Sequence, residues 1–354
     1  MKRVWMVLLC LVLLAAPAEA TVKWVDFDLS CEAMERALRL EEQSREQDNP
    51  QSWIKILALA ATQCGGNPKP ADVTAACRSL MAGKSPKEIL GGNDSYYQYY
   101  LEAYTAVLGG LAGNYAVKID GEWKPAWGIK AFSPIAAGYW YADSDDFGAS
   151  RSYGFRRRHL GHDMMGSLGT PIIAVESGTV EALGWNQYGG WRVGIRTDDR
   201  KRYYYYAHLR KDTPYAPGLK EGDRVEAGQV IGFMGRTGYS HTENVNNIET
   251  VHLHFGIQLI FEEWQKECNS EIWIDAYQIV RLLERHRSSV VYDAETGTWE
   301  RIYEFRDLDE NPLPYCHSER SEESSVTSSE KILRSFHSLR MTSIRFPVFF
   351  GKLS

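Results

Sequence analysis

Apolar positions recur at close to the helical period in the first third of the chain. Three segments carry this pattern and are separated by the glycine-rich breaks GGNPKP and GGND. Residues three or four apart share one face of a helix, so each segment predicts a helix with a buried face. The segments are SWIKILALAATQ (52–63), ADVTAACRSLMAG (71–83) and YYQYYLEAYTAVLGGLAG (96–113). We therefore expect a helical N-terminal region over residues 21–117.

The pattern changes at about residue 120 to short β-branched and aromatic runs that are broken by glycine. Strands at such close spacing are typical of an antiparallel sheet or sandwich. The runs are PIIAVESGTVEALGW, WRVGIRTDD, RYYYYAHL, DRVEAGQVIGFMG and VHLHFGIQLIF. The sequence therefore predicts an α+β fold, in which the helical region is followed by a mainly antiparallel β-rich domain over residues 118–300.

Two further elements are expected after these strands. The segment EIWIDAYQIVRLLERHR (271–287) has the spacing of one helix, and VVYDAETGTWERIYEF predicts a hairpin that turns at Thr296 and Gly297. Residues 301–315 would complete the end of that hairpin.

The two ends of the chain have compositions of their own. Lys2 and Arg3 precede an apolar run that ends in an A-x-A pattern, so residues 1–20 predict a secretory signal cleaved before Thr21. The run is shorter than a bilayer span, which leaves an uncleaved anchor as the alternative and no stable membrane span after cleavage. Residues 316–354 are rich in serine and arginine and predict a disordered tail. A wall-binding tail is the rival, and a frame extension without a role is another.

Composition and charge narrow the function classes. The 354 residues are 44% hydrophobic and 24% charged, which fits a packed core and about two folded units. The formal net charge of −6 provides no general attraction for nucleic acid, so we expect no nucleic-acid partner.

Five cysteines would remain after export, which is an odd number. Cys64 and Cys77 could form a disulfide across GGNPKP, and the sequence leaves this open. No CxxC motif is present, which disfavours a cysteine zinc cluster.

Histidines are concentrated in one part of the β-rich region. Six of the nine fall between residues 159 and 254, and they are His159, His162, His208, His241, His252 and His254. A single histidine is most simply a core or surface residue, but such clustering suggests a metal site. A catalytic zinc takes three protein ligands from histidine and carboxylate side chains and leaves one position open.

The stretch HLGHDMMG contains two of these histidines and one aspartate. Its glycines and the following proline argue against a helix, so the segment should be extended or looped. Adjacent residues of an extended chain point to opposite faces, whereas residues i and i+4 share a face. His159 and Asp163 therefore form the easier pair, and His162 points away. By the same alternation, His252 and His254 share one face, which makes a four-point site from two neighbouring strands conceivable.

Several motifs together resemble the lysostaphin-type (LytM-like) zinc endopeptidases of bacterial peptidoglycan. They are H-x-G-x-D, GTPIIAVESGTV, YAHL, EGDRVEAGQVIGFMGRTG and HLHF, in the family's order over residues 155–260. The resemblance implies that His159, Asp163 and His254 bind one zinc ion per chain, and that His208 and His252 are catalytic histidines that are not ligands. It also implies a groove over the metal, peptidoglycan as the partner, and a secreted, cell-wall-associated enzyme that hydrolyses peptide bonds.

Two rival functions come from other classes. A LytM-like regulator that binds the wall without hydrolysing it typically lacks metal ligands, whereas every expected ligand is present here. A biotin- or lipoyl-carrier domain needs a lysine at its hairpin turn, and FMGRTG carries Arg236 instead. Both rivals are therefore disfavoured.

Two departures from the family pattern concern the surroundings of the site. YSHTENVNNIETV lengthens the connection between GRTG and HLHF, so this loop is a candidate gate, with His241, Asn244 and Asn247 as candidate substrate contacts and a solvated loop as the alternative. Gly256 follows HLHF where an acidic residue is common.

The aromatic residues are expected to divide between groove walls and core, and Met164 and Met165 to fill the core. These aromatic residues are Trp185, Tyr188, Trp191 and the run from Tyr203 to Tyr206.

Overall fold

The computed structural model describes residues 22–152, 156–263, 265 and 270–308. The predicted signal peptide and the predicted C-terminal tail lie outside the described residues, as does the end of the segment 301–315. Within the described part, no helix combines the length and the apolar character that a membrane crossing requires. N-terminal helices are followed by a mainly antiparallel β-sheet domain, which confirms the expected α+β fold.

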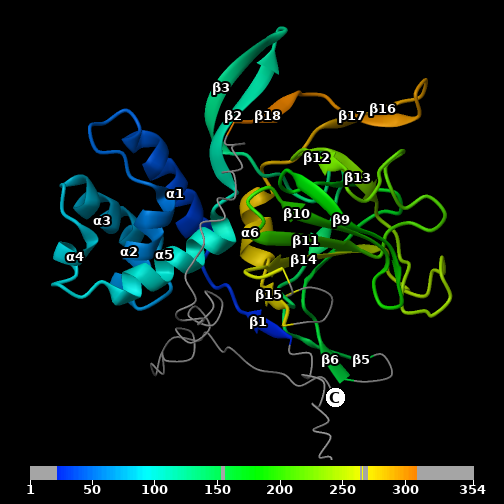
Figure 1. Cartoon of the computed structure of the whole chain (residues 1–354), viewed down its shortest axis with the longest axis horizontal. Coiled ribbons are helices and arrows are strands. Elements are labelled where there is room, and N and C mark those ends of the chain that lie inside the picture. Colours follow the sequence, from blue (N-terminus) through cyan, green and yellow to red (C-terminus); the bar gives the residue numbers. More distant parts are fainter. Residues whose placement is uncertain (1–21, 153–155, 264, 266–269, 309–354) are drawn as a thin grey trace, which may run out of the picture.

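The N-terminal helices lie together on one side of the molecule (Figure 1). Helices α2, α3 and α5 occupy the three segments predicted from the helical period, whereas α1 was not predicted. The helices are α1 (Cys31–Ser44), α2 (Trp53–Cys64), α3 (Pro70–Met81), α4 (Pro86–Ile89) and α5 (Ser95–Leu108). Ser30 begins α1 by accepting a hydrogen bond from the Ala33 N–H, and Gly65 ends α2 at a φ of 79° that glycine adopts without strain. The described cysteines, which include Cys64 and Cys77, are free.

A nine-stranded sheet forms the centre of the second region. Its strands are β1 (Lys23–Val25), β4 (Ala142–Asp143), β7 (His162–Met165), β9 (Gly178–Asn186), β10 (Gly190–Thr197), β11 (Arg202–Ala207), β12 (Arg224–Val225), β14 (His252–Leu259) and β15 (Ile272–Ile274). The main path runs β1-β15-β14-β11-β10-β9-β12, and β7 pairs with both β14 and β4. Only the β1–β15 pair of this sheet is parallel; the other pairs of the described strands are antiparallel.

Smaller sheets surround the central one. They are β2 (Ala112–Ile119) with β3 (Glu122–Ile129) and β18 (Phe305–Asp307), β5 (Ser150–Ser152) with β6 (Arg156–Arg158), β8 (Pro171–Ile173) with β13 (Val230–Phe233), and β16 (Val290–Asp293) with β17 (Thr298–Arg301). The β16–β17 pair confirms the predicted hairpin. Strand β18 does not extend that hairpin but pairs with β2, which lies far earlier in the chain.

The segment expected to be one helix over residues 271–287 is divided between two elements. Ile272 to Ile274 form strand β15, and only Tyr277–Leu283 form helix α6. Asp275 lies between them and accepts a hydrogen bond from the Tyr277 N–H at 2.9 Å, so the helix begins only there. The prediction of a single helix was wrong because pairing of the β-branched residues with β14 outweighs the helical spacing.

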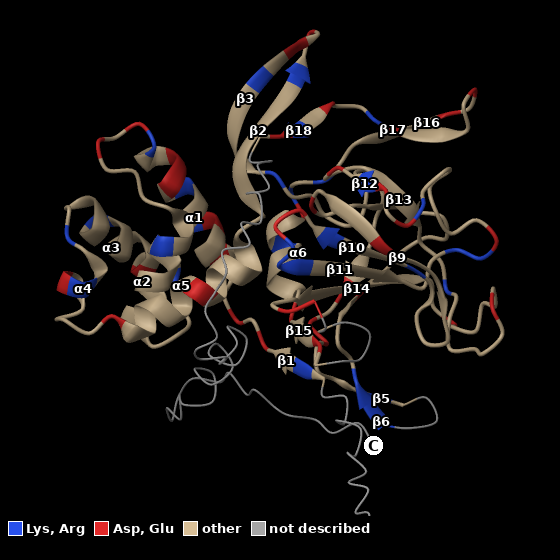
Figure 2. Ribbon diagram, in the orientation of Figure 1, with Lys and Arg blue, Asp and Glu red and all other residues tan. Residues whose placement is uncertain are grey.

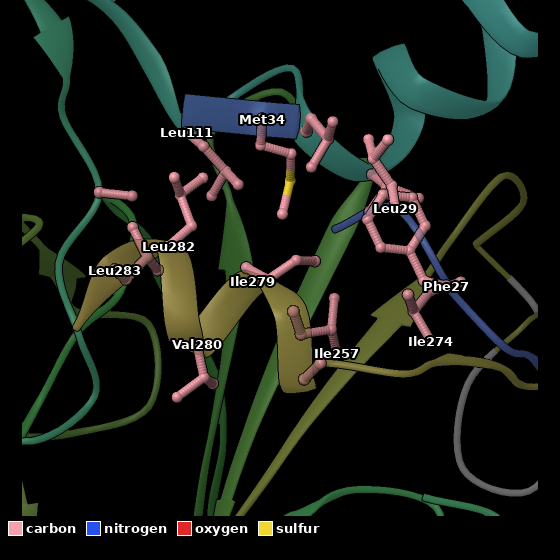
Figure 3. Close-up of a cluster of buried hydrophobic side chains, with 14 of the residues drawn as sticks. Phe27, Leu29, Met34, Leu111, Ile257, Ile274, Ile279, Val280, Leu282 and Leu283 are labelled. Carbon is pink, nitrogen blue, oxygen red and sulfur yellow. The ribbon is translucent and has the colours of Figure 1, made fainter. Parts of the chain in front are cut away.

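The core continues from the sheet into the helical region. Helix α6 lies between them, and Figure 3 shows Ile279 of α6 facing Met34 of α1 within a cluster of buried apolar side chains. Ile257 of β14 and Ile274 of β15 belong to the same cluster. The helices and the sheet therefore share one core, and packing within this core fixes the position of β14.

A buried ion cluster also joins the two regions. The Arg202 guanidinium donates to Glu176 at 2.8 Å, to Asp199 at 2.8 Å and to the Ala106 carbonyl of α5 at 3.0 Å. The Tyr204 hydroxyl donates to Glu176 as well. Arg202 is 1% exposed. Each of these hydrogen bonds pairs a polar group that would otherwise be buried without a partner. The bond from Arg202 to the Ala106 carbonyl therefore fixes α5 against the start of β11.

Candidate metal centre and groove

Strands β7 and β14 place the histidines and the aspartate side by side. Asp163 is directly opposite His254 in the antiparallel register, and Met165 is opposite His252. Leu253 is fully buried between the two histidines, as the period of two along an extended chain requires. The extended conformation of this stretch was predicted, and it brings the two sequence motifs together across nearly a hundred residues.

Three side chains converge at this point. His159 Nε2 lies 3.0 Å from Asp163 Oδ1 and 3.0 Å from His254 Nδ1, and His254 Nδ1 lies 2.9 Å from the same carboxylate oxygen. Two imidazole nitrogens and a carboxylate oxygen that face one another can share a cation once the rings have released their protons there. Within the described residues, this is the only group of three potential ligands that converges, and its ligand atoms all lie within 4.8 Å of one another. The triad fits a metal site.

His162 lies on the other face of β7, as predicted. Its Nε2 is 2.8 Å from a carboxylate oxygen of Asp143, and its ring lies against Tyr277. The side chain is 2% exposed, so it is a paired core histidine.

Gly161, at the neighbouring position, has a different role: a Cβ there would come within 2.4 Å of the His254 ring. The glycine of H-x-G-x-D is therefore the residue that allows the His254 imidazole to approach the backbone.

The charges around His159 come from two carboxylates. Burial lowers the pKa of His159, but hydrogen bonds and charges from Asp146 and Asp163 outweigh it and raise the pKa to about 9. Burial raises the pKa of Asp163, but the hydrogen bonds of His159 and His254 outweigh it and hold that pKa well below the usual value. His254 has no second carboxylate, and burial lowers its pKa. The three potential metal ligands are therefore one carboxylate that stays ionised and two imidazoles.

Asp146 was missed by the sequence reasoning. Its Oδ1 lies 3.2 Å from His159 Nδ1, on the side of the ring away from the triad. Arg151 pairs with Asp146 in turn, and its guanidinium also lies 3.8 Å from Asp163. A carboxylate on Nδ1 directs the lone pair of Nε2 toward a metal. No local pattern marks this residue, because the contact spans a loop whose path the sequence does not specify.

His208 and His252 stand beside the triad with their rings 4.7 Å apart. His208 Nδ1 lies 2.9 Å from the Thr237 carbonyl, and His252 Nδ1 lies 2.9 Å from the Thr250 carbonyl. A carbonyl only accepts, so each Nδ1 carries a proton and each Nε2 is left to accept or to donate. His252 Nε2 is 3.8 Å from Asp163 Oδ1.

The backbone and the surroundings of His208 are unusual. Its φ of 61° is in the left-handed region that a non-glycine residue rarely adopts, which is typical of positions where a side chain is held for a function. Burial, together with the neighbouring His252 and His254, lowers the pKa of His208 well below its ordinary value. The ring is therefore neutral at pH 7 and able to accept a proton at Nε2.

A groove of about 900 Å³ opens over these histidines. Of the aromatic candidates, Tyr188, Tyr203 and Tyr205 line it, whereas Tyr204 and Tyr206 are buried in the core. Trp185 and Trp191 do not line the groove but pack edge to face against each other. Met164 is fully buried, as expected of a core residue.

Part of the groove wall comes from residues that the sequence reasoning did not select. Trp24 of β1 and Trp273 of β15 line the groove, although β1 precedes the helical region. Trp273 also explains Gly256, because a Cβ at that position would lie 2.5 Å from the indole ring. Arg157 is another lining residue, and the run RRR before His159 was the signal that could have identified it.

The long loop before β14 contributes Tyr239 to the groove. The side chain of Asn244 accepts hydrogen bonds from Trp191 Nε1 and the Asp212 N–H, both at 2.9 Å. Asn247 donates to the Tyr239 carbonyl at 2.7 Å. The amides of both asparagines therefore fix the loop, and neither these two residues nor His241 line the groove.

Comparison with known proteins locates the region of similarity. Residues 157–267 match the model described as peptidase family M23. The L-Ala–D-Glu endopeptidase of Bacillus subtilis (strain 168) is 37% identical over 153 residues, which cover 43% of this chain and 43% of that protein. Lysostaphin of Staphylococcus simulans is 39% identical over 98 residues, 27% of this chain and 17% of that protein.

A solved structure covers a larger part of the chain. The crystal structure of a protein from Ruminococcus gnavus ATCC 29149, assigned as a glycyl-glycine endopeptidase, aligns with 74% of this chain and 94% of its own, at 25% identity and a TM-score of 0.47. The chain spans less than half the length of the curated relatives described above.

Proposed function

Because residues 157–267 match the model of peptidase family M23 and include a complete His-Asp-His triad, we propose that the protein is a zinc-dependent endopeptidase of peptidoglycan. It hydrolyses peptide bonds in stem peptides or cross-bridges, and it does so as an extracytoplasmic, cell-wall-associated enzyme. The Bacillus subtilis relative named above is an endopeptidase by its name, which supports the reaction class. The observation that carries the proposal is the convergence of three ligand atoms at the floor of a groove.

In this proposal, His159, Asp163 and His254 hold one zinc ion per chain. Two nitrogens and one oxygen form the donor set of a catalytic zinc site, which leaves a fourth position for water or substrate. When bound, zinc polarises the scissile carbonyl and lowers the pKa of a water molecule to about 7. Asp146 keeps the His159 ring in the orientation that points Nε2 toward the ion, because Nδ1 is held on the opposite side.

His208 and His252 then move protons. Each has its Nδ1–H engaged with a backbone carbonyl and its Nε2 free toward the site. One of them accepts the proton of the attacking water at Nε2, and the other, with a proton on Nε2 as well as on Nδ1, donates a hydrogen bond to the oxyanion that develops on the substrate. A neutral His208 is suited to accept a proton, and no covalent intermediate is required. The two rings are close enough for these roles to be coupled.

Digestion of purified peptidoglycan tests the proposal. The full chain, loaded with zinc, should release new amino and carboxyl ends that mass spectrometry assigns to one type of peptide bond. Removal of the metal by a chelator should stop the release, and addition of zinc should restore it. Absence of cleavage by the zinc-loaded protein, together with activation of a separate amidase, would instead identify a wall-binding regulator.

A further inference from the structure

The wall of the groove contains an arginine whose side chain is only partly engaged. Arg157 lies on β6, in the hairpin that Figure 2 colours as basic. Its guanidinium lies 5.0 Å over the Tyr239 ring and donates one hydrogen bond to the Tyr239 hydroxyl. Its Nε is buried and has no hydrogen-bond partner. A buried N–H without an acceptor is costly, so this group needs an explanation.

The two neighbouring arginines of the β5–β6 hairpin have partners already, whereas Arg192 of β10, which also lines the groove, likewise has an Nε without a partner. Arg151 pairs with Asp146, and the Arg158 guanidinium lies 5.2 Å over the Trp24 ring. Arg157 therefore differs from both neighbours, because its contacts with Tyr239 leave part of its planar set of donors unused.

The acids of the groove are not available to Arg157 either. Glu181 lies 3.3 Å from the Arg196 guanidinium, and Glu271 accepts a hydrogen bond from Trp273 Nε1 at 2.9 Å. Asp163 is occupied by the two histidines of the triad. Arg157 thus lines a groove whose carboxylates have partners of their own, and a ligand in the groove can supply an acceptor for its guanidinium.

We propose that Arg157 binds a carboxylate of the substrate, so that the enzyme prefers peptide bonds next to an acidic residue. This inference rests on the proposed function. A guanidinium presents parallel N–H groups that match the two oxygens of a carboxylate, and Tyr239 holds one edge of that fork in place. A substrate made only of glycine offers no such acceptor.

The position of Tyr239 determines how close the carboxylate lies to the reacting bond. The Tyr239 ring is 5.8 Å from the His208 ring on one side and 5.0 Å from the Arg157 guanidinium on the other. An extended peptide advances about 3.3 Å per residue. A carboxylate bound by Arg157 therefore belongs to a residue within about three positions of the bond that is cleaved.

The test compares two synthetic stem peptides, L-Ala-D-Glu-L-Lys-D-Ala and its counterpart in which the glutamate carboxylate is a carboxamide. The zinc-loaded full chain should cleave the acid with a kcat/KM roughly 10- to 100-fold higher than the amide, as expected for a hydrogen bond to a charged group. Arg157→Met should reduce this preference to within about twofold. Arg157→Lys keeps the charge and loses the paired N–H groups of the guanidinium. Its preference for the acid should lie between those of the unaltered protein and Arg157→Met.

Arg156→Met is the matched control. Arg156 precedes Arg157 on the same strand, is exposed, and does not line the groove, so its loss should leave the preference unchanged. Zinc content and melting temperature of each variant establish that it is folded and loaded. Equal cleavage of acid and amide by the unaltered protein, or an unaltered preference in Arg157→Met, would overturn the inference while cleavage itself upholds the proposed function. Absence of cleavage of both peptides and of whole peptidoglycan would refute the proposed function instead.

Discussion

Two clusters of charged and polar side chains lie at opposite ends of strand β11. Arg202 begins the strand and binds Glu176, Asp199 and the Ala106 carbonyl, while His208 directly follows the strand and stands next to the triad. Both clusters are largely buried and both contain strong hydrogen bonds. In the Arg202 cluster, donors meet acceptors, and the surrounding carboxylates raise the pKa of Arg202 despite burial.

The triad has the opposite chemistry. His159 and His254 direct nitrogens toward one another and toward the same oxygen of Asp163, so three potential metal ligands converge on one point. Burial and short distances are therefore common to both clusters. The convergence of three ligand atoms distinguishes the site that can bind a cation, and the following substitutions test this distinction in order of expected effect.

The largest effect is expected at the triad. His159→Ala, Asp163→Ala or His254→Ala removes one ligand, so zinc should be lost and peptidoglycan hydrolysis abolished while the fold persists. Release of cleaved muropeptides and zinc content by atomic absorption measure the two effects. His241→Ala, on the loop and outside the groove lining, is the control and should retain both. Full activity in the metal-free protein would contradict the zinc mechanism.

A smaller loss of activity is expected at the two neighbouring histidines. His208→Ala and His252→Ala should keep zinc bound while kcat falls roughly 10²- to 10⁴-fold, the range for general acid and base catalysis. Parallel measurement of zinc content and turnover separates these variants from those of the triad. Loss of zinc in the His252 variant with retention in the His254 variant would show that the two roles are exchanged.

At the Arg202 cluster the expected effect is on stability. Arg202→Met leaves Glu176 buried without its charged partner, which should lower the free energy of unfolding by about 3–5 kcal/mol. Denaturant titration measures this, and the zinc affinity of the folded variant should be unchanged. Arg224→Met is the control: it removes an exposed pair with Asp198 and should cost about 1 kcal/mol or less. Wild-type stability of Arg202→Met would mean that the cluster does not fix α5.

The mildest change is expected at Asp146, which contacts the triad from outside. Asp146→Ala should weaken zinc binding roughly 10- to 100-fold, because His159 Nδ1 loses the carboxylate at 3.2 Å and keeps only the backbone carbonyl of residue 146 at 3.4 Å. Asp146→Asn retains an acceptor oxygen and should weaken binding less. Competition with a chelator of known affinity gives the zinc dissociation constant of each variant. Equal affinity in all three proteins would limit Asp146 to a role in packing.

The sequence predicts features that depend on neighbouring residues. The helical spacing identified α2, α3 and α5, and alternation along extended segments paired His159 with Asp163 and turned His162 away. It did not reveal features that arise from contacts between distant segments. Trp273 was expected in a helix, and it lies on a strand because β14 provides a partner for it. Asp146 and Arg157 acquire significance only when the loops around the triad are in place.

Strand β1 has a consequence for how this protein can be divided. It runs parallel to β15 and contributes Trp24 to the groove, yet the five helices separate it in the chain from the rest of the sheet. The helical region is thus an insertion within the β-sheet domain, held at both ends. The groove is consequently built from two separate stretches of the chain: recombination that transfers only the part after the helices would transfer the triad without one wall of its groove.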